Sequence, residues 1–410
     1  AEIYFIVRRI FRSPEERKTG LAANEKRDFA MRISNQLAGG NIQLLSISGK
    51  EALLDVELRD TEGDWFYWMF RADFPEEGVY RFRFASPNRV GTRGPAFRRR
   101  GKVQWKWLHP EGYAETQEFS WFCGEGGETV EFCMGMQYLA EDWERFLCEM
   151  NSPELKSGIL CRSGKGRNVE MAKVGKEDAK FRVLLTSRHH AGEMMATHAL
   201  EGILREACAE TPFGRDFREN VLLCTVPFVD KDGVEDGDQG KNRRPHDYAR
   251  DYGPEPLYPE VRAVQKLVEE MKPDFVLDLH CPWIRGGNSN ERPYLVGWPG
   301  EKSIRGSRLF GQKLEKEAPP ETPFRQMDHI PFGSQWNNAR NYQQGRPLPL
   351  WVQSFPFIRF AQSLEIPFAN FGPRTVDHES MLLFGASIAR AIRAVLENRT
   401  VDDFKESNLL

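Results

Sequence analysis

Hydrophobic and polar residues alternate in short segments along the first third of the chain. Four such segments, residues 41–48, 51–58, 65–74 and 79–85, are separated by clusters of glycine, aspartate and proline. An alternation with a period of two is typical of strands that bury one face, and such clusters are typical of turns. The pattern predicts a small antiparallel β-sandwich over residues 33–124.

After residue 125 the pattern changes to continuous apolar runs of strand length, at residues 182–187, 221–229 and 275–279. Segments with helical periodicity alternate with these runs, the clearest at residues 194–208, 259–271 and 379–397. Buried strands that alternate with helices indicate an α/β domain. The expected fold class is therefore α/β, with a mixed, largely parallel sheet flanked by helices, preceded by the small antiparallel β-sandwich.

These patterns divide the 410 residues into three parts. Residues 1–32 are rich in charge and weakly patterned, and we expect them to form an irregular N-terminal segment. Residues 33–124 are assigned to the sandwich and residues 125–410 to the large α/β domain. A chain of this length is also expected to contain two or three domains, since a domain usually has about 100–200 residues.

Composition and charge narrow the possible partners. The 57 lysines and arginines nearly balance the 60 aspartates and glutamates, for a formal net charge of −3. This balance argues against a nucleic acid as partner, because nucleic-acid binding depends on neutralising phosphates.

No run of about 18 apolar residues occurs, so no membrane-spanning helix is expected. The seven cysteines form no CxxC pair, which favours reduced thiols. Localisation leans towards the cytoplasm, with a secreted or periplasmic mature chain left open.

The most informative segment, residues 186–193 (TSRHHAGE), joins an apolar strand to a helix. His190 and Glu193 are three residues apart, and on such a turn both side chains can face one point. They supply two of the three protein ligands of a His₂Glu catalytic zinc site. His280 ends the apolar run at residues 275–279, at the sheet edge where open α/β sheets bind their ligands. The sequence therefore predicts one zinc ion held by His190, Glu193 and His280, whereas His189 is expected to point elsewhere and pack.

Glu365 is the one carboxylate in the short apolar strand at residues 362–367. A carboxylate in such a strand costs free energy unless it is paired or functional. Beside a zinc ion it could accept a proton from the bound water and deliver it to a leaving amine. A salt-bridged residue at the sheet edge is the alternative interpretation.

With these residues, the sequence resembles the M14 zinc carboxypeptidase family. Five short motifs occur in the family's order: HAGE at 190–193, DKDGV at 230–234, DYAR at 247–250, DLH at 278–280 and SLE at 363–365. The β-rich region before them resembles the N-terminal sandwich of the cytosolic-carboxypeptidase-like members, as does GRNV at 166–169. The resemblance covers most of the chain from about residue 33.

The resemblance implies a role for each matching position. His190, Glu193 and His280 would hold zinc, and Glu365 would be general base and then general acid. Asp247 would hydrogen-bond the far nitrogen of a ligand histidine, expected to be His190.

Three further roles are implied for substrate and transition state. Arg250 would bind the terminal carboxylate of the substrate. A second cation would stabilise the oxyanion, with Arg243 the first candidate and Lys241 the next. Tyr342 would cap the substrate, although residues 337–344 contain no anchoring motif.

Two positions depart from the family pattern. Ala249 replaces the asparagine that accompanies the carboxylate-binding arginine, and Asp230-Lys231 replace the Asn-Pro of the turn. The first change removes one amide donor from the terminal-carboxylate site. Both changes bear on exopeptidase specificity more than on the zinc chemistry.

The function predicted from the sequence is a zinc metallocarboxypeptidase that hydrolyses an amide bond at the C-terminal end of a peptide. One alternative is a related zinc deacylase or amidase acting on small N-acyl amino acids or cell-wall peptides. The other alternative is a non-catalytic binding protein on the same scaffold. The side-chain preference of the substrate site and the oligomeric state are not defined by the sequence.

Overall fold

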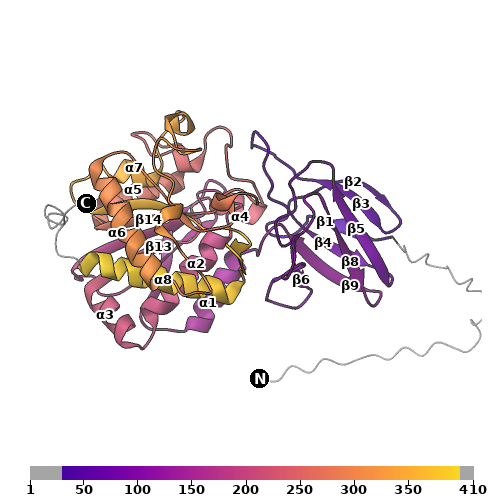
Figure 1. The fold of residues 1–410 in the computed structure, drawn as a ribbon, viewed down its shortest axis with the longest axis horizontal. Helices are drawn as coiled ribbons and strands as arrows, with labels where there is room; N and C mark the ends of the chain where they lie inside the picture. Colours follow the sequence, from indigo (N-terminus) through magenta and orange to yellow (C-terminus); the bar gives the residue numbers. More distant parts are fainter. Residues whose placement is uncertain (1–29, 398–410) are drawn as a thin grey trace, which may run out of the picture.

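The computed structural model describes residues 30–397, so residues 1–29 of the expected N-terminal segment lie outside the described part of the chain. Figure 1 shows two lobes that lie side by side, the first built of strands and the second of strands and helices. Within residues 30–397, no helix is both long enough and apolar enough to cross a membrane.

The N-terminal lobe is a sandwich of two sheets. One sheet has the order β1 (Arg32–Ser34), β4 (Met69–Phe74), β9 (Glu128–Cys133), β6 (Ala96–Arg99) and β7 (Lys106–Trp107). The other has the order β2 (Gln43–Ser48), β3 (Glu51–Asp55), β5 (Gly78–Phe84) and β8 (Glu118–Cys123). All neighbours are antiparallel except β3 and β5, which are parallel. The expected sandwich is therefore present, with one parallel pair; the exact limits of the domains stay a prediction.

The sandwich core follows from the alternation of the sequence. In β5 and β8 every second side chain is buried, and the buried positions are mostly aromatic. Phe82 and Phe119 stack with ring centroids 4.8 Å apart, and Trp68 and Phe132 pack around them. Aromatic side chains bury large apolar areas, so this cluster stabilises a lobe of modest size.

The second lobe contains a seven-stranded mixed sheet. Its order is β10 (Leu155–Arg162), β11 (Asn168–Val174), β13 (Val221–Val226), β12 (Phe181–Ser187), β14 (Phe275–His280), β16 (Phe360–Glu365) and β15 (Tyr294–Val296). The four strands β13, β12, β14 and β16 are parallel, and the outer strands pair antiparallel. Parallel strands covered on both faces are apolar throughout, which explains the continuous apolar runs. The predicted fold class is confirmed.

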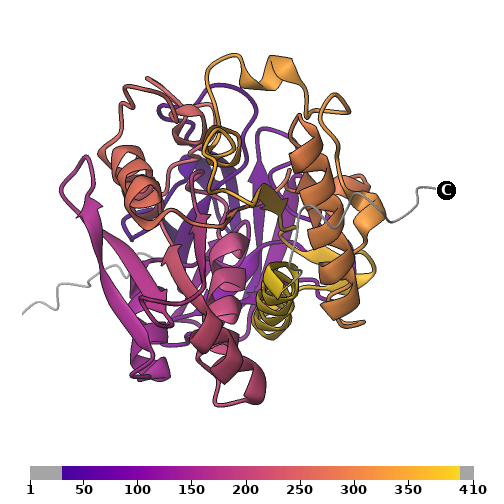
Figure 2. The ribbon, with the colours of Figure 1, turned by 90° about the vertical axis from the view of Figure 1, so that its left-hand side faces the viewer.

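Helices cover both faces of this sheet (Figure 2). The helices are α1 (Ala140–Met150), α2 (Met195–Cys208), α3 (Pro212–Asn220), α4 (Lys231–Asp236), α5 (Pro259–Met271), α6 (Glu301–Glu317), α7 (Leu348–Val352) and α8 (His378–Glu397). One apolar cluster joins α2, α3, α6 and α8 to one face, and another joins α5 and α7 to the opposite face. The shorter elements are η1 (Tyr248–Arg250), η2 (Asn288–Asn290), η3 (Gln326–Asp328), η4 (Ala339–Tyr342), β17 (Asn370–Phe371) and β18 (Arg374–Thr375).

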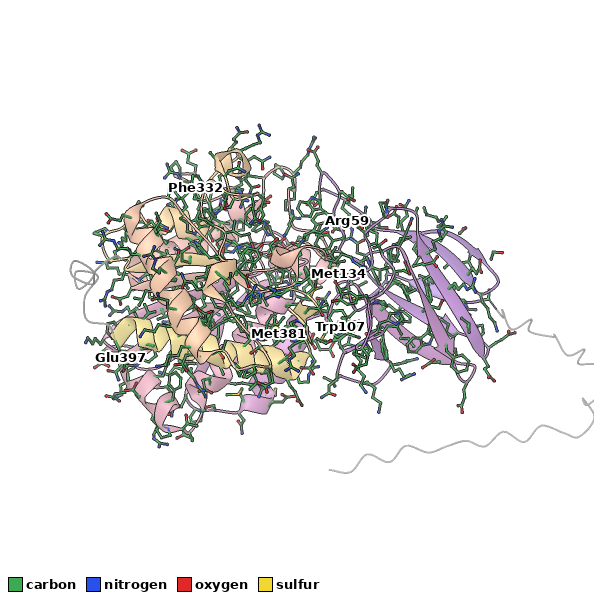
Figure 3. All side chains as sticks on the ribbon, viewed as in Figure 1. Arg59, Trp107, Met134, Phe332, Met381 and Glu397 are labelled. Carbon is green, nitrogen blue, oxygen red and sulfur yellow. The ribbon has the colours of Figure 1, made fainter. Side chains whose placement is uncertain are left out.

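The two lobes are joined by an apolar cluster that runs through both and by polar contacts. Figure 3 labels Arg59, Trp107 and Met134 where the lobes meet. The Arg59 guanidinium donates to Asp238 at 2.8 Å, and the Trp107 indole donates to the Val376 carbonyl at 2.5 Å. Because these contacts fix the sandwich against the α/β lobe, side chains of the sandwich can contribute to a site on that lobe.

Candidate metal centre and active site

The three candidate ligands lie at the carboxyl edge of the parallel strands. His280 is the last residue of β14, and His190 and Glu193 lie on the turn between the neighbouring strand β12 and helix α2. Arg188 begins this turn with a positive φ of 60°. Its buried guanidinium donates to the Ala191 carbonyl at 2.8 Å and to the Tyr138 carbonyl at 2.9 Å. These bonds hold the turn in place and aim both side chains at His280.

The Glu193 carboxylate lies between the two imidazoles. Its Oε1 is 2.9 Å from Nδ1 of His190, and its Oε2 is 2.8 Å from Nδ1 of His280. All three side chains are buried, and their ligand atoms lie within 4.8 Å of one another. Two imidazole nitrogens and one carboxylate that converge in this way are the donor set of a catalytic zinc site. We call His190, Glu193 and His280 the candidate metal centre.

The outer nitrogen of each histidine faces another carboxylate. Nε2 of His190 is 3.3 Å from Oδ1 of Asp247, and Nε2 of His280 is 2.8 Å from Oδ2 of Asp278. Burial opposes ionisation of both aspartates, but the neighbouring histidines lower their pKa, so both carry charge. Carboxylates in this position fix the tautomer and orientation of metal-binding histidines. Asp247 thus lies beside His190, the histidine expected from the sequence, at an ion-pair distance; Nε2 of His190 has no hydrogen-bond partner among the described residues.

Asp278 was not assigned a role from the sequence. Its position two residues before His280 in the same strand puts both side chains on one face, and this spacing is the signal that could have identified it. Asp278 also meets His189, whose Nδ1 lies 2.8 Å from its Oδ1 while Nε2 lies 2.6 Å from the Tyr252 hydroxyl. The potential ligand atoms of His189, Asp278 and His280 also lie close enough together to hold a metal ion. Both nitrogens of His189 already have partners, which favours the centre around Glu193.

Glu365 ends β16 directly beside the candidate metal centre. It pairs in register with His280 on the adjacent strand. Its Oε2 is buried and has no hydrogen-bond partner, which is costly for a carboxylate. Burial raises the pKa of Glu365, and the nearby charge of Glu193 acts in the same direction. A buried carboxyl with one free oxygen and a raised pKa suits proton transfer.

Lys241, and not Arg243, is the cation that lies at the candidate metal centre. Its Nζ is 2.6 Å from Oε1 of Glu193 and donates to the Cys281 carbonyl at 3.1 Å. The ammonium also lies 5.4 Å from the ring centre of Trp65, a residue of the sandwich.

Arg243, the first candidate from the sequence for the oxyanion cation, lies in a different network of contacts. Its guanidinium donates to the carboxylates of Asp60, Asp230 and Asp238 and stacks over Tyr248. Three carboxylates, one of them from the other lobe, hold this guanidinium away from the candidate metal centre. Asp60 is distant in sequence, so the local motif gave no sign of this arrangement.

A cavity of about 620 Å³ opens beside these groups. Its lining includes the functional candidates His190, Lys241, Asp247, Arg250 and Glu365. Three tryptophans and several amides complete the wall, the tryptophans being Trp65, Trp283 and Trp336. A concave site with aromatic walls and a few convergent polar groups is typical of small-molecule and peptide recognition.

Arg250 and Tyr342 meet at the rim of the cavity. The Arg250 guanidinium lies 4.8 Å from the ring centre of Tyr342 and donates to the Asn341 carbonyl at 3.2 Å. The Tyr342 hydroxyl donates to Asn337 at 2.8 Å, and Tyr342 is not among the residues that line the cavity. Arg250 therefore lines the cavity, whereas the hydroxyl of Tyr342 is directed to Asn337.

Comparisons with known proteins agree with this geometry. A family model described as zinc carboxypeptidase, of the M14 peptidases, matches residues 143–256. This segment contains His190, Glu193, Asp247 and Arg250, and it ends before His280. A search of curated proteins returned no match.

Solved structures resemble the whole described chain. A metallo-carboxypeptidase from Burkholderia cenocepacia is 18% identical with a TM-score of 0.74, covering 90% of this chain and 100% of that one. A metallo-carboxypeptidase from Pseudomonas aeruginosa, in complex with (2-guanidinoethylmercapto)succinic acid, is 17% identical with a TM-score of 0.70, covering 89% and 99%. The family match confirms the predicted resemblance to the M14 family and agrees with the predicted enzyme class, a zinc metallocarboxypeptidase. The solved structures share the fold of the chain.

Proposed function

We propose that this chain hydrolyses an amide bond at the C-terminal end of a peptide, with zinc held by His190, Glu193 and His280. The observation that carries the proposal is the arrangement of the two histidines. Both Nδ1 atoms face one carboxylate, and both Nε2 atoms face an aspartate. This donor set fits a catalytic zinc ion with an open position. A bound zinc ion would polarise the scissile carbonyl and bring the pKa of its water towards about 7.

In this proposal, Glu365 acts as general base and then as general acid. Its unpartnered Oε2 is the atom that would take a proton from the attacking water. The same atom would then deliver the proton to the leaving amine. The raised pKa of the buried carboxyl supports both steps, since it brings the group closer to neutral pH.

Lys241 would stabilise the negative charge that develops on the carbonyl oxygen. The ammonium lies at the centre, 2.6 Å from Oε1 of Glu193. A lysine offers a compact, mobile charge where an arginine offers a fixed planar fork. The assignment reverses the order expected for Lys241 and Arg243.

Arg250 would bind the terminal carboxylate of the substrate. Its guanidinium lines the cavity, with side-chain hydrogen bonds only to backbone carbonyls of Asn341 and Ala249 among the described residues. The guanidinium can therefore exchange these neutral acceptors for a carboxylate, which is a stronger partner.

A second candidate function is hydrolysis of N-acyl amino acids or cell-wall peptides. Ala249 favours it, because the alanine removes an amide donor next to Arg250 and leaves the terminal carboxylate with fewer partners. The wide cavity, with its tryptophans and amides, also accepts groups larger than one side chain.

Product analysis on matched peptides separates these functions. Peptides with free and with amidated C-termini are digested with and without a zinc chelator, and the products are identified by mass spectrometry. We expect release of the terminal residue from free peptides only, and no release with the chelator. An Arg250→Gln variant should raise KM on free peptides, whereas a Glu111→Gln variant on the exposed surface should not. Equal turnover of amidated peptides would favour the amidase.

A further inference from the structure

A second pair of histidines lies outside the candidate active site, between two helices that are neighbours in Figure 1. His198 lies in the first turn of α2, and His378 is the first residue of α8. Their ring centres are 5.3 Å apart at an angle of 74°, and their Nδ1 atoms are 3.2 Å apart. We call His198 and His378 the second histidine pair.

The outer nitrogens of this pair also face oxygen atoms. Nε2 of His198 lies 3.1 Å from the Met136 carbonyl, which can only accept a hydrogen bond. The proton of neutral His198 is therefore on Nε2, and the lone pair on Nδ1 points to His378. Burial, and the neighbouring His378, lower the pKa of His198 to about 3, which keeps it neutral. Nε2 of His378 lies 3.8 Å from Oε1 of Glu201.

The arrangement repeats that of the candidate metal centre. There the rings of His190 and His280 are 5.0 Å apart at 55°, with both Nδ1 atoms inward and both Nε2 atoms directed at oxygen. Two nitrogens bound at about 2.0–2.1 Å to one tetrahedral ion are about 3.3 Å apart. The 3.2 Å between the Nδ1 atoms of His198 and His378 is close to this separation.

A cavity of about 180 Å³ adjoins the second histidine pair and gives an ion room for further ligands. Its lining includes both histidines and three carboxylates, those of Asp142, Glu149 and Glu201. Glu201 accepts from the Tyr138 hydroxyl at 2.8 Å and from Arg205 at 2.8 Å. Glu149 pairs with Arg205 at 3.0 Å, and Asp142 pairs with Arg145. Water is therefore the available ligand beside the two imidazoles.

We propose that His198 and His378 form a second zinc site, bound through their Nδ1 atoms and completed by water from this cavity. Imidazole nitrogen is a preferred ligand of zinc and related divalent ions. On binding, zinc takes the place of the proton between the two Nδ1 atoms. That proton moves to Nε2 of His378, on the side of Glu201, so both imidazoles bind zinc in their neutral form. With two protein ligands, this site binds zinc more weakly than the candidate metal centre. Bound zinc ties the start of α2 to the start of α8, so it stabilises the fold.

Metal analysis after dialysis against rising free zinc tests the proposal. We expect one ion per chain at low free zinc and a second at higher free zinc. His378→Gln should retain only the first ion, and the matched variant His109→Gln, on an exposed loop, should retain both. A wild-type chain that stays at one ion, or a His378→Gln chain that keeps two, would overturn the second site.

Thermal unfolding provides an independent readout. The side chain of His378 is 38% exposed, so its replacement is expected to leave the fold intact, as circular dichroism would verify. At zinc concentrations that fill the second site, Tm should rise further for the wild type and for His109→Gln but not for His378→Gln. Peptidase activity should be equal in all three at low free zinc. The second site does not depend on the proposed peptidase function: a chain without peptidase activity would still bind the second ion. An equal rise of Tm in His378→Gln would contradict the role of this pair.

Discussion

The candidate metal centre and the second histidine pair place similar imidazoles in different surroundings. In both, the Nδ1 atoms converge and the Nε2 atoms face oxygen. In the first, the Glu193 carboxylate lies between the Nδ1 atoms. In the second, Glu201 lies on the outer side of His378 and is already held by Tyr138 and Arg205.

The surroundings account for the different roles proposed for the two sites. His190 and His280 are both buried, each backed by a charged aspartate that raises the basicity of the ring. His198 is backed by a neutral carbonyl, and His378 is partly exposed. Within residues 30–397, no buried carboxylate with an unpartnered oxygen corresponds to Glu365 at the second histidine pair. The third ligand, Glu193, and the base, Glu365, are therefore expected to account for the difference.

The largest effect is expected for Glu193→Gln. The change removes the charged ligand between the imidazoles and takes the paired carboxylate away from the ammonium of Lys241. Zinc affinity of the centre should fall by more than about 100-fold, since even changes behind a ligand cost 10–100-fold. Zinc titration measures the affinity of both sites. An equal loss of zinc affinity at the second histidine pair would contradict the contrast between the two sites.

Glu365→Gln should lower kcat by about 100- to 10,000-fold, the usual contribution of a positioned acid–base group. The amide keeps the shape of the carboxyl but cannot accept the proton. Zinc content should stay at the wild-type value, because Glu365 is not one of the proposed ligands. A variant that hydrolysed peptides at the full rate would refute its role without affecting the metal assignment.

Lys241→Met should lower kcat by about 100- to 1,000-fold, as loss of an oxyanion partner does. The control is Arg243→Met, which leaves the cavity unchanged but removes the partner of Asp60, Asp230 and Asp238. Breaking such a buried network should cost about 3–5 kcal/mol in the free energy of unfolding. Steady-state kinetics and urea unfolding separate the two outcomes. A kcat loss in folded Arg243→Met alone would restore the original preference for Arg243.

The sequence was sufficient where short motifs end neighbouring parallel strands. The ends of β12, β14 and β16 meet at one edge, so His190, His280 and Glu365 could be brought together without a structure. The choice between Lys241 and Arg243 could not be made, because it depends on Asp60 from the other lobe and on Asp238.

The second histidine pair shows the same limit. His198 and His378 are 180 residues apart, and no motif links them. Tyr342 lies in an irregular segment where only the tertiary contact with Asn337 fixes its hydroxyl. Local patterns thus predict residues placed by strand ends, and fail for residues whose neighbours come from distant segments.

The smallest effect concerns the sandwich, which contributes a tryptophan to each cavity: Trp65 beside the candidate metal centre and Trp105 beside the second histidine pair. Trp65 lies over the Lys241 ammonium, a contact of about 0.5–1 kcal/mol. Trp65→Leu should therefore weaken kcat/KM by about 2- to 5-fold, since 1.4 kcal/mol corresponds to tenfold. Trp105→Leu should leave kcat/KM unchanged, because its cavity is separate from the proposed chemistry. Equal losses in both variants would mean that the sandwich acts through stability and not through contact with the active site.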